Sequence, residues 1–152
     1  MSTLKDQLRT DLTSAMKARD KDRAGTLRMV MASITEAEVA GKEAKELTDD
    51  EIITILTREA KKRREAATAF ADGGRPEQAE KETAEAAVIT EYLPAQLSAE
   101  EISDLVSKAI APTGAADEGM RAMGKVMGIL TPQTKGRADG GSVAAEVRKQ
   151  LA

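Results

Sequence analysis

The sequence of 152 residues contains no cysteine, no histidine and no tryptophan, with a single phenylalanine and a single tyrosine. Without cysteine the chain has no disulfide, no zinc–thiolate site and no thiol nucleophile. Without histidine it lacks the side chain that most often acts as a general base and as a metal ligand. Phosphate-binding Gly-Lys-Ser/Thr loops and serine nucleophile elbows are missing as well. The sequence therefore predicts no catalytic residue, no metal and no cofactor.

Long apolar runs are also absent. No segment approaches the roughly 20 residues needed to cross a membrane, and the N-terminus lacks the hydrophobic region of a signal peptide. We therefore expect a cytoplasmic protein with no membrane part. Hydrophobic residues make up 41% of the chain, but aromatics are scarce, so the core must consist of Leu, Ile, Val, Met and Ala. This composition favours helices over strands, and the predicted fold class is all-α.

The spacing of apolar residues predicts an N-terminal domain of about four helices, residues 1–94, and a small three-helix C-terminal domain, residues 95–152. Pro94 marks the boundary because the residue before a proline is biased away from helix. A Gly-Gly-Arg-Pro break predicts that the third and fourth helices form a long antiparallel hairpin. The predicted helices are Leu4–Lys21, Arg23–Ala40, Asp49–Ala71, Pro76–Tyr92, Ala99–Ala111, Glu118–Leu130 and Ser142–Leu151.

Several polar residues have the positions of helix caps. Thr48 and Ser98 are each followed three residues later by glutamate, which is the pattern of a capping box. Asp22 is the expected cap of the helix that begins at Arg23, and Ser142 is the expected cap of the last helix.

Charge is distributed unevenly along the chain. The net charge is −3, but residues 120–152 hold six cations and two anions, a net charge of +4, which leaves −7 for residues 1–119. A segregated charge of this kind can steer a polyanion to one end of a protein.

The least ordinary stretch runs from Met123 to Gly140. Gly124 and Gly128 interrupt a helical pattern at a cost of roughly 1 kcal/mol each, and we expect another backbone to pack closely against them. Pro132 is expected to end this helix, since it has no amide hydrogen. The loop that follows carries two cations, Lys135 and Arg137, and two glycines, Gly136 and Gly140. The glycines would let its backbone approach an anion such as phosphate. Met120, Met123 and Met127 have helical spacing and are interpreted as core filler.

Other charged groups are interpreted as solvent-exposed. The basic run at residues 61–64 cannot form one face, because consecutive helical residues point about 100° apart. Arg64 is expected to pair with a glutamate between Glu82 and Glu85 across the hairpin. The acidic groups at residues 36–38, 49–51 and 80–85 are expected to be solvated carboxylates, because a bundle metal site normally adds histidine. Binding of Mg²⁺ through oxygen ligands alone is the alternative, for which the sequence has no specific signal.

Four separated segments, in matching order, are similar to the GatB/YqeY family, and together they span nearly the whole chain. They are Leu27–Ile34 (LRMVMASI), Glu91–Ser98 (EYLPAQLS), Met123–Gly128 (MGKVMG) and Lys135–Gly140 (KGRADG). The resemblance implies an all-helical protein similar to the C-terminal tail of the B subunit of glutamine-dependent Glu/Asp-tRNA amidotransferase. That tail looks like the part that contacts tRNA, while the kinase and transamidase chemistry lies in domains that these segments do not match.

The family label, a carbon–nitrogen ligase with glutamine as amido-N-donor, thus implies at most an accessory to amidation. Our first hypothesis is a module that binds tRNA or another structured RNA, with a possible protein partner in translation or tRNA amidation. The alternative is an adaptor that docks a protein partner through the Met- and Gly-rich helix. An enzyme in its own right is a third reading, which the missing nucleophiles and bases disfavour. The candidate RNA-binding residues are Arg121, Lys125, Lys135, Gly136 and Arg137.

Overall fold

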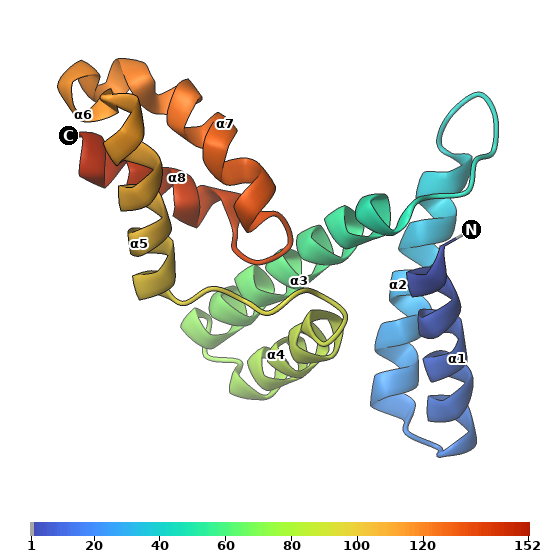
Figure 1. The fold of residues 1–152 in the computed structure, drawn as a ribbon. Helices are drawn as coiled ribbons and strands as arrows, with labels where there is room; N and C mark the ends of the chain where they lie inside the picture. Colours follow the sequence, from blue (N-terminus) through green and yellow to red (C-terminus); the bar gives the residue numbers. More distant parts are fainter. Residues whose placement is uncertain (1) are drawn as a thin grey trace. The chain divides into compact units, whose positions relative to one another are not determined.

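The computed structural model describes residues 2–152, with only the backbone described at Ala115 and Ala116. The predicted all-α class is confirmed, since this part of the chain forms helices and turns without a β-strand (Figure 1). The chain divides into two compact units, one ending at Leu93 and the other running from Pro94 to Ala152. That these units fold independently stays a prediction.

The N-terminal unit contains four helices: α1 (Thr3–Lys17), α2 (Lys21–Val39), α3 (Asp49–Asp72) and α4 (Pro76–Thr90). Figure 1 shows α3 and α4 side by side as the predicted hairpin. The core of the N-terminal unit consists of one aliphatic stripe from each of its helices, as the spacing predicted. The largest fully buried side chains there are Leu8, Leu27, Val30, Ile34, Ile52, Leu56 and Ile89.

The turn between α1 and α2 differs from the prediction. Arg19 adopts a left-handed conformation with φ of 57°, and the Asp20 amide donates to the Ala15 carbonyl at 3.0 Å. This is a Schellman ending, which reverses the chain at once. The helix α2 therefore begins earlier, and Asp20 caps it by accepting from the Arg23 amide at 3.1 Å. The expectation that Asp22 is the cap was wrong.

Two carboxylates expected to be solvated instead fix the start of α1. The Asp49 carboxylate accepts from the Ser2 hydroxyl and, at 3.2 Å, from the Leu4 amide. The Glu38 carboxylate pairs with Lys5 Nζ at 2.7 Å. Hydrogen bonds from Ser2 hold the pKa of Asp49 below its usual range, and the bond from Lys5 does the same for Glu38. These carboxylates connect α1 to the ends of α2 and α3.

The hairpin encloses an arginine with three glutamates. Arg63 Nη2 lies 3.2 Å from Glu59 Oε2, and Arg63 Nε lies 3.4 Å from Glu85 Oε2 and 3.8 Å from Glu82 Oε2. The Arg63 side chain is only 11% exposed. Burial, together with the neighbouring Glu82 charge, raises the pKa of Glu85 above its ordinary value. The predicted partner, Arg64, is exposed, and so the ion-pair prediction was wrong by one residue.

The C-terminal unit is built on α5 (Ala99–Ile110), α7 (Met123–Thr134) and α8 (Gly140–Leu151), which all pack on one another. The Ser98 capping box at the start of α5 is confirmed with both of its bonds. At Thr48 the structure gives one of the two bonds of a capping box, from the Glu51 amide to the Thr48 hydroxyl at 3.2 Å. The predicted loop after α5 contains a 3-10 turn at Ala111–Thr113 and the start of the short α6 (Ala115–Glu118). Residues Gly119–Ala122, predicted to begin the next helix, form a second 3-10 turn, and α7 begins only at Met123. The buried core residues are Val106, Ala109, Ile110, Ala122, Val126, Leu130, Val143, Val147 and Leu151.

Pro132 does not end its helix, contrary to the prediction. It lies inside α7, which continues to Thr134. Proline removes one backbone hydrogen bond and its ring crowds the carbonyl four residues earlier. Here that residue is exposed Gly128, and only two helical residues follow the proline. The buried Thr134 hydroxyl donates to the Leu130 carbonyl at 3.1 Å, which holds the last turn in place.

Among residues 2–152, no helix has the length and apolar character required to cross a membrane.

We predict that Arg63→Met lowers the free energy of unfolding by about 2–3 kcal/mol, because it leaves three carboxylates around a half-buried site without a cation. Urea unfolding followed by circular dichroism measures this loss. Arg64→Met removes the same charge from an exposed neighbouring position and should change the free energy by less than about 0.5 kcal/mol. Equal effects of the two substitutions would contradict the role assigned to Arg63.

We also predict that a fragment of residues 94–152 folds by itself, because its core is formed entirely by its own helices. The fragment should be helical by circular dichroism and unfold cooperatively on heating. A fragment that shows no helix at room temperature would indicate that the chain is a single folding unit.

Candidate nucleic-acid interface

The loop between α7 and α8 contains three of the candidate residues, Lys135, Gly136 and Arg137. Gly136 adopts a left-handed conformation with φ of 73°, and the Arg137 amide donates to the Thr134 carbonyl at 2.9 Å. A residue with a side chain is strained at such a φ, whereas glycine is not. The loop is therefore a tight turn that depends on Gly136.

This loop binds the segment that precedes α5. The Leu97 amide donates to the Arg137 carbonyl at 2.8 Å, and Gln96 Nε2 donates to the Gly136 carbonyl at 2.7 Å. Arg137 Nε donates to the Ala95 carbonyl at 3.2 Å. Gly136 is buried, so its backbone cannot approach a phosphate, contrary to the expectation. Two segments about 40 residues apart in the chain thus hold each other in place.

The remaining candidates are exposed cations. Lys135 follows the last residue of α7, Lys125 lies in its first turn and Arg121 in the preceding 3-10 turn. Lys125 Nζ makes a long bond of 3.4 Å to the Thr113 carbonyl. In the described part of the chain these three cations form no ion pair. Arg137 differs, because its half-buried guanidinium already holds the Ala95 carbonyl.

The acidic residues nearby have local partners. Glu146 accepts from Gln150 Nε2 at 2.8 Å, and this bond lowers its pKa. Asp139 occupies the cap position of α8, and the Ser142 hydroxyl donates to it at 3.4 Å. The helix thus begins at Gly140, and the expectation that Ser142 is its cap was wrong.

The two glycines of α7 do not pack against another backbone. Both are exposed, and a methyl group added at either position would meet no atom within 4 Å beyond the helix's own backbone. The expectation of close internal packing was therefore wrong. Lys125, Gly128 and Ile129 share this outward side, since residues three to four apart lie on one helical face.

The methionines divide between core and surface. Met123 and Met127 pack against the C-terminal core, as predicted. Met120, in the 3-10 turn before α7, is 49% exposed, so its interpretation as core filler was wrong. Ile129 is 37% exposed, which adds apolar atoms to the outward side of α7.

Comparison with known proteins places these observations in a family. A family model described as Yqey-like protein matches residues 5–151. The chain belongs to the YqeY-like family. The domain of this family is found in stand-alone YqeY proteins and in the C-terminal tail of GatB, and the family resemblance of the four sequence segments is thereby confirmed.

Two curated fungal proteins are similar to this YqeY-like chain. "Altered inheritance of mitochondria protein 41, mitochondrial" from Pyrenophora tritici-repentis is 31% identical over 136 residues, which cover 87% of this chain and 71% of that protein. "Uncharacterized protein C22F3.15" from Schizosaccharomyces pombe is 34% identical over 92 residues, covering 60% and 72%. The first name refers to mitochondria, so the cytoplasmic location expected for this chain stays a prediction.

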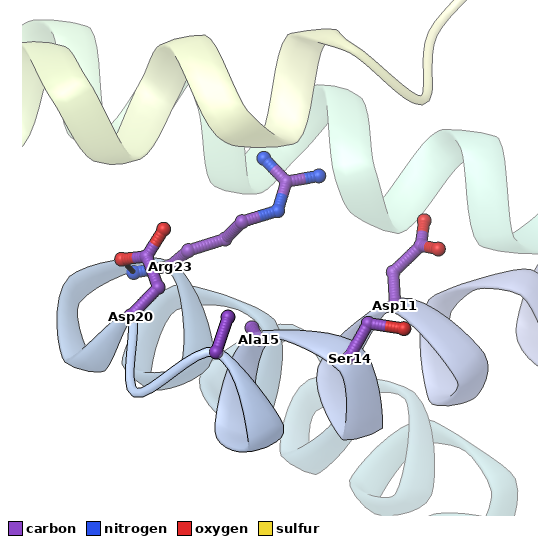
Figure 2. Close-up of a pocket in the computed structure, with 6 residues that line it drawn as sticks. Asp11, Ser14, Ala15, Asp20 and Arg23 are labelled. Atoms are coloured by element: carbon purple, nitrogen blue, oxygen red, sulfur yellow. Dashed lines mark hydrogen bonds between the residues drawn. The ribbon is translucent and has the colours of Figure 1, made fainter.

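Sequence reasoning missed the role of the only tyrosine. The Tyr92 hydroxyl donates to Asp11 Oδ2 at 2.6 Å and accepts from Arg23 Nη2 at 3.3 Å, while Arg23 Nη1 pairs with Glu91 at 2.8 Å. Burial and the bond to Asp11 raise the pKa of Tyr92, which keeps the phenol neutral. Figure 2 shows Asp11 and Arg23 beside a pocket of about 270 Å³. The cluster fastens the end of α4 to α1 and α2, and the rarity of tyrosine was its only signal.

We predict opposite effects of alanine at the exposed and the turn glycines. Gly124→Ala and Gly128→Ala should each stabilise the C-terminal unit by about 0.5–1 kcal/mol, since alanine is the better helix former and nothing obstructs it. Gly136→Ala should destabilise the unit by about 1–2 kcal/mol because of its left-handed conformation. Hydrogen exchange of the Val126 and Val147 amides reports on this unit. Destabilisation by both α7 substitutions would mean that these glycines have an internal packing role.

Proposed function

We propose that this YqeY-like chain binds structured RNA, with tRNA as the candidate class, through the outward side of α7 and the cations beside it. The observation that carries the proposal is the position of Lys125 and Lys135, exposed and without an acidic partner in residues 2–152, next to helix backbone left bare at Gly124 and Gly128. Phosphate groups are the ligands that such cations attract. The bare glycines also let a bulky polyanion approach the helix closely.

The arrangement favours recognition of backbone and shape over recognition of bases. Phe70 and Tyr92, the only aromatic residues, both precede Pro94, so the C-terminal unit has no aromatic side chain on which a base can stack. RNA helices are commonly bound through their phosphates and shape. A folded RNA such as tRNA suits these requirements better than an unstructured single strand.

Arg137 has a different role in this proposal from Lys125 and Lys135. Its Nε donates a hydrogen bond to the Ala95 carbonyl, which fixes the segment before α5. Only its Nη groups are then presented to a ligand. We propose that Arg121 extends the cationic surface at the other end of α7.

We further propose that RNA binding serves tRNA-dependent amidation as an accessory activity, on the basis of the family's occurrence in the GatB tail. The catalytic steps would then belong to a partner, since this chain lacks histidine and cysteine.

A second candidate function is a protein adaptor, which the exposed Met120 and Ile129 side chains favour. Apolar docking depends weakly on salt, whereas phosphate contacts release counterions and depend on it strongly. The salt dependence of binding therefore separates the two candidates.

We predict that Lys125→Gln/Lys135→Gln weakens tRNA binding and makes the plot of log affinity against log salt shallower by about two units, about one for each lost phosphate contact. Fluorescence anisotropy with a labelled tRNA transcript, measured from about 50 to 200 mM salt, gives both quantities. The matched control, Lys62→Gln/Arg64→Gln, removes two exposed charges from α3. Identical slopes of log affinity against log salt for the two variants would refute the RNA proposal, as would no binding by the wild type at low salt. Either result would favour the protein-adaptor function.

A further inference from the structure

The turn between α1 and α2 carries a second group of cations, which the proposed function does not use. They surround a pocket of about 520 Å³ in the N-terminal unit. The apolar side of the pocket is formed by Ala15, Met16 and Ala24, and its cationic side by Arg19, Lys21 and Arg28. Pockets of this volume are large enough for a small organic ligand.

The three cations lack carboxylate partners. Arg19, Lys21 and Arg28 are all exposed, and none of them forms an ion pair within residues 2–152. The one anion in the lining is Asp20, whose carboxylate is occupied in accepting from the Arg23 amide at 3.1 Å. The pocket lining therefore has a net charge of +2, from three cations and one anion, with its negative group turned to the helix cap.

Arg28 is held by a sulfur atom instead of an acid. Its Nη2 lies 3.5 Å from Met16 Sδ, near the end of α1. A thioether is a weak acceptor and does not neutralise the guanidinium. The contact positions Arg28 over the apolar side of the pocket and leaves most of its donors available. Met16 itself is 47% exposed, so the apolar surface beside this guanidinium is open.

Arg19 occupies a backbone position that favours glycine. It is the left-handed residue of the Schellman ending, with φ of 57°, where glycine is the usual occupant. A side chain at this φ costs stability, and such strain is concentrated at functional sites. Arg19 is thus both the strained residue and one of the three cations of the pocket. We therefore associate the strain with the charge that Arg19 brings to the pocket.

From these observations we propose that the pocket binds a nucleotide phosphate. The guanidinium groups of Arg19 and Arg28 take its oxygens by charge-assisted hydrogen bonds, and Lys21 adds a point charge. The base lies on the exposed apolar surface of Met16. This site is in the N-terminal unit and does not depend on RNA binding by α7. The nucleotide has two possible sources, a free nucleotide or a phosphorylated end of an RNA strand.

The test is titration of the full chain with ADP, with inorganic phosphate and with a 5′-phosphorylated RNA tetranucleotide, followed by NMR of the α1–α2 turn amides. Arg28→Gln should weaken ADP binding about tenfold, the value of one charge-assisted interaction. Arg19→Gly should weaken it similarly while raising the melting temperature, because glycine removes the left-handed strain. A loss of binding together with increased stability cannot result from misfolding.

Two controls separate this proposal from the preceding one. Lys62→Gln removes an exposed charge from α3 and should bind ADP as the wild type does. Lys125→Gln/Lys135→Gln should also retain ADP binding, even if it loses tRNA. Tighter binding of ADP than of the tetranucleotide would support the free nucleotide as the source, and the reverse order would support the RNA end.

Three results would overturn the proposal. The first is an absence of binding by the wild type to all three probes. The second is equal affinity of the wild type, Arg28→Gln and Arg19→Gly for ADP. The third is an affinity for ADP no greater than that for inorganic phosphate, which would eliminate the base contact with Met16.

Discussion

Burial of aliphatic side chains in small cores is the interaction on which the rest of this structure depends. With one phenylalanine and one tyrosine in the chain, the helices must pack through leucine, isoleucine, valine and alanine. Small cores of this kind leave little surplus stability. Polar contacts at the helix ends complete the N-terminal unit, with Asp49 and Glu38 at the start of α1 and Tyr92 at the end of α4.

The same constraint shapes the C-terminal unit, where a tight backbone turn joins in the polar contacts. Gly136 and Arg137 present their carbonyls to Gln96 and Leu97. Backbone groups that are buried must be paired, and this loop and the segment before α5 pair with each other. Arg137 therefore makes a structural contact with the Ala95 carbonyl. Lys125 and Lys135 are exposed and form no ion pair within residues 2–152.

Both proposed binding surfaces combine unpaired cations with a local departure from ideal helix chemistry. On α7 the departure is two glycines that gain nothing from internal packing, and at the α1–α2 turn it is an arginine in a left-handed conformation. Each feature lowers stability without improving the core. By contrast, Arg63, which the core does use, is surrounded by carboxylates. The unpaired cations at these two destabilised positions are the ones that we propose to bind ligands.

The sequence by itself determined the all-α class, the four helices of the N-terminal unit and the family, because apolar periodicity, caps and motifs are local properties. It also determined that histidine and thiol chemistry are excluded. Tertiary structure decided the partners of side chains. The glycine–proline break located the hairpin, and a turn centred near Gly74 selected Arg64. Consecutive helical residues point about 100° apart, and it is Arg63 that faces the glutamates of α4. Whether Gly124 and Gly128 face a backbone or solvent, and whether Gly136 is exposed or buried, depends on segments distant in the chain, and no local pattern contains that information.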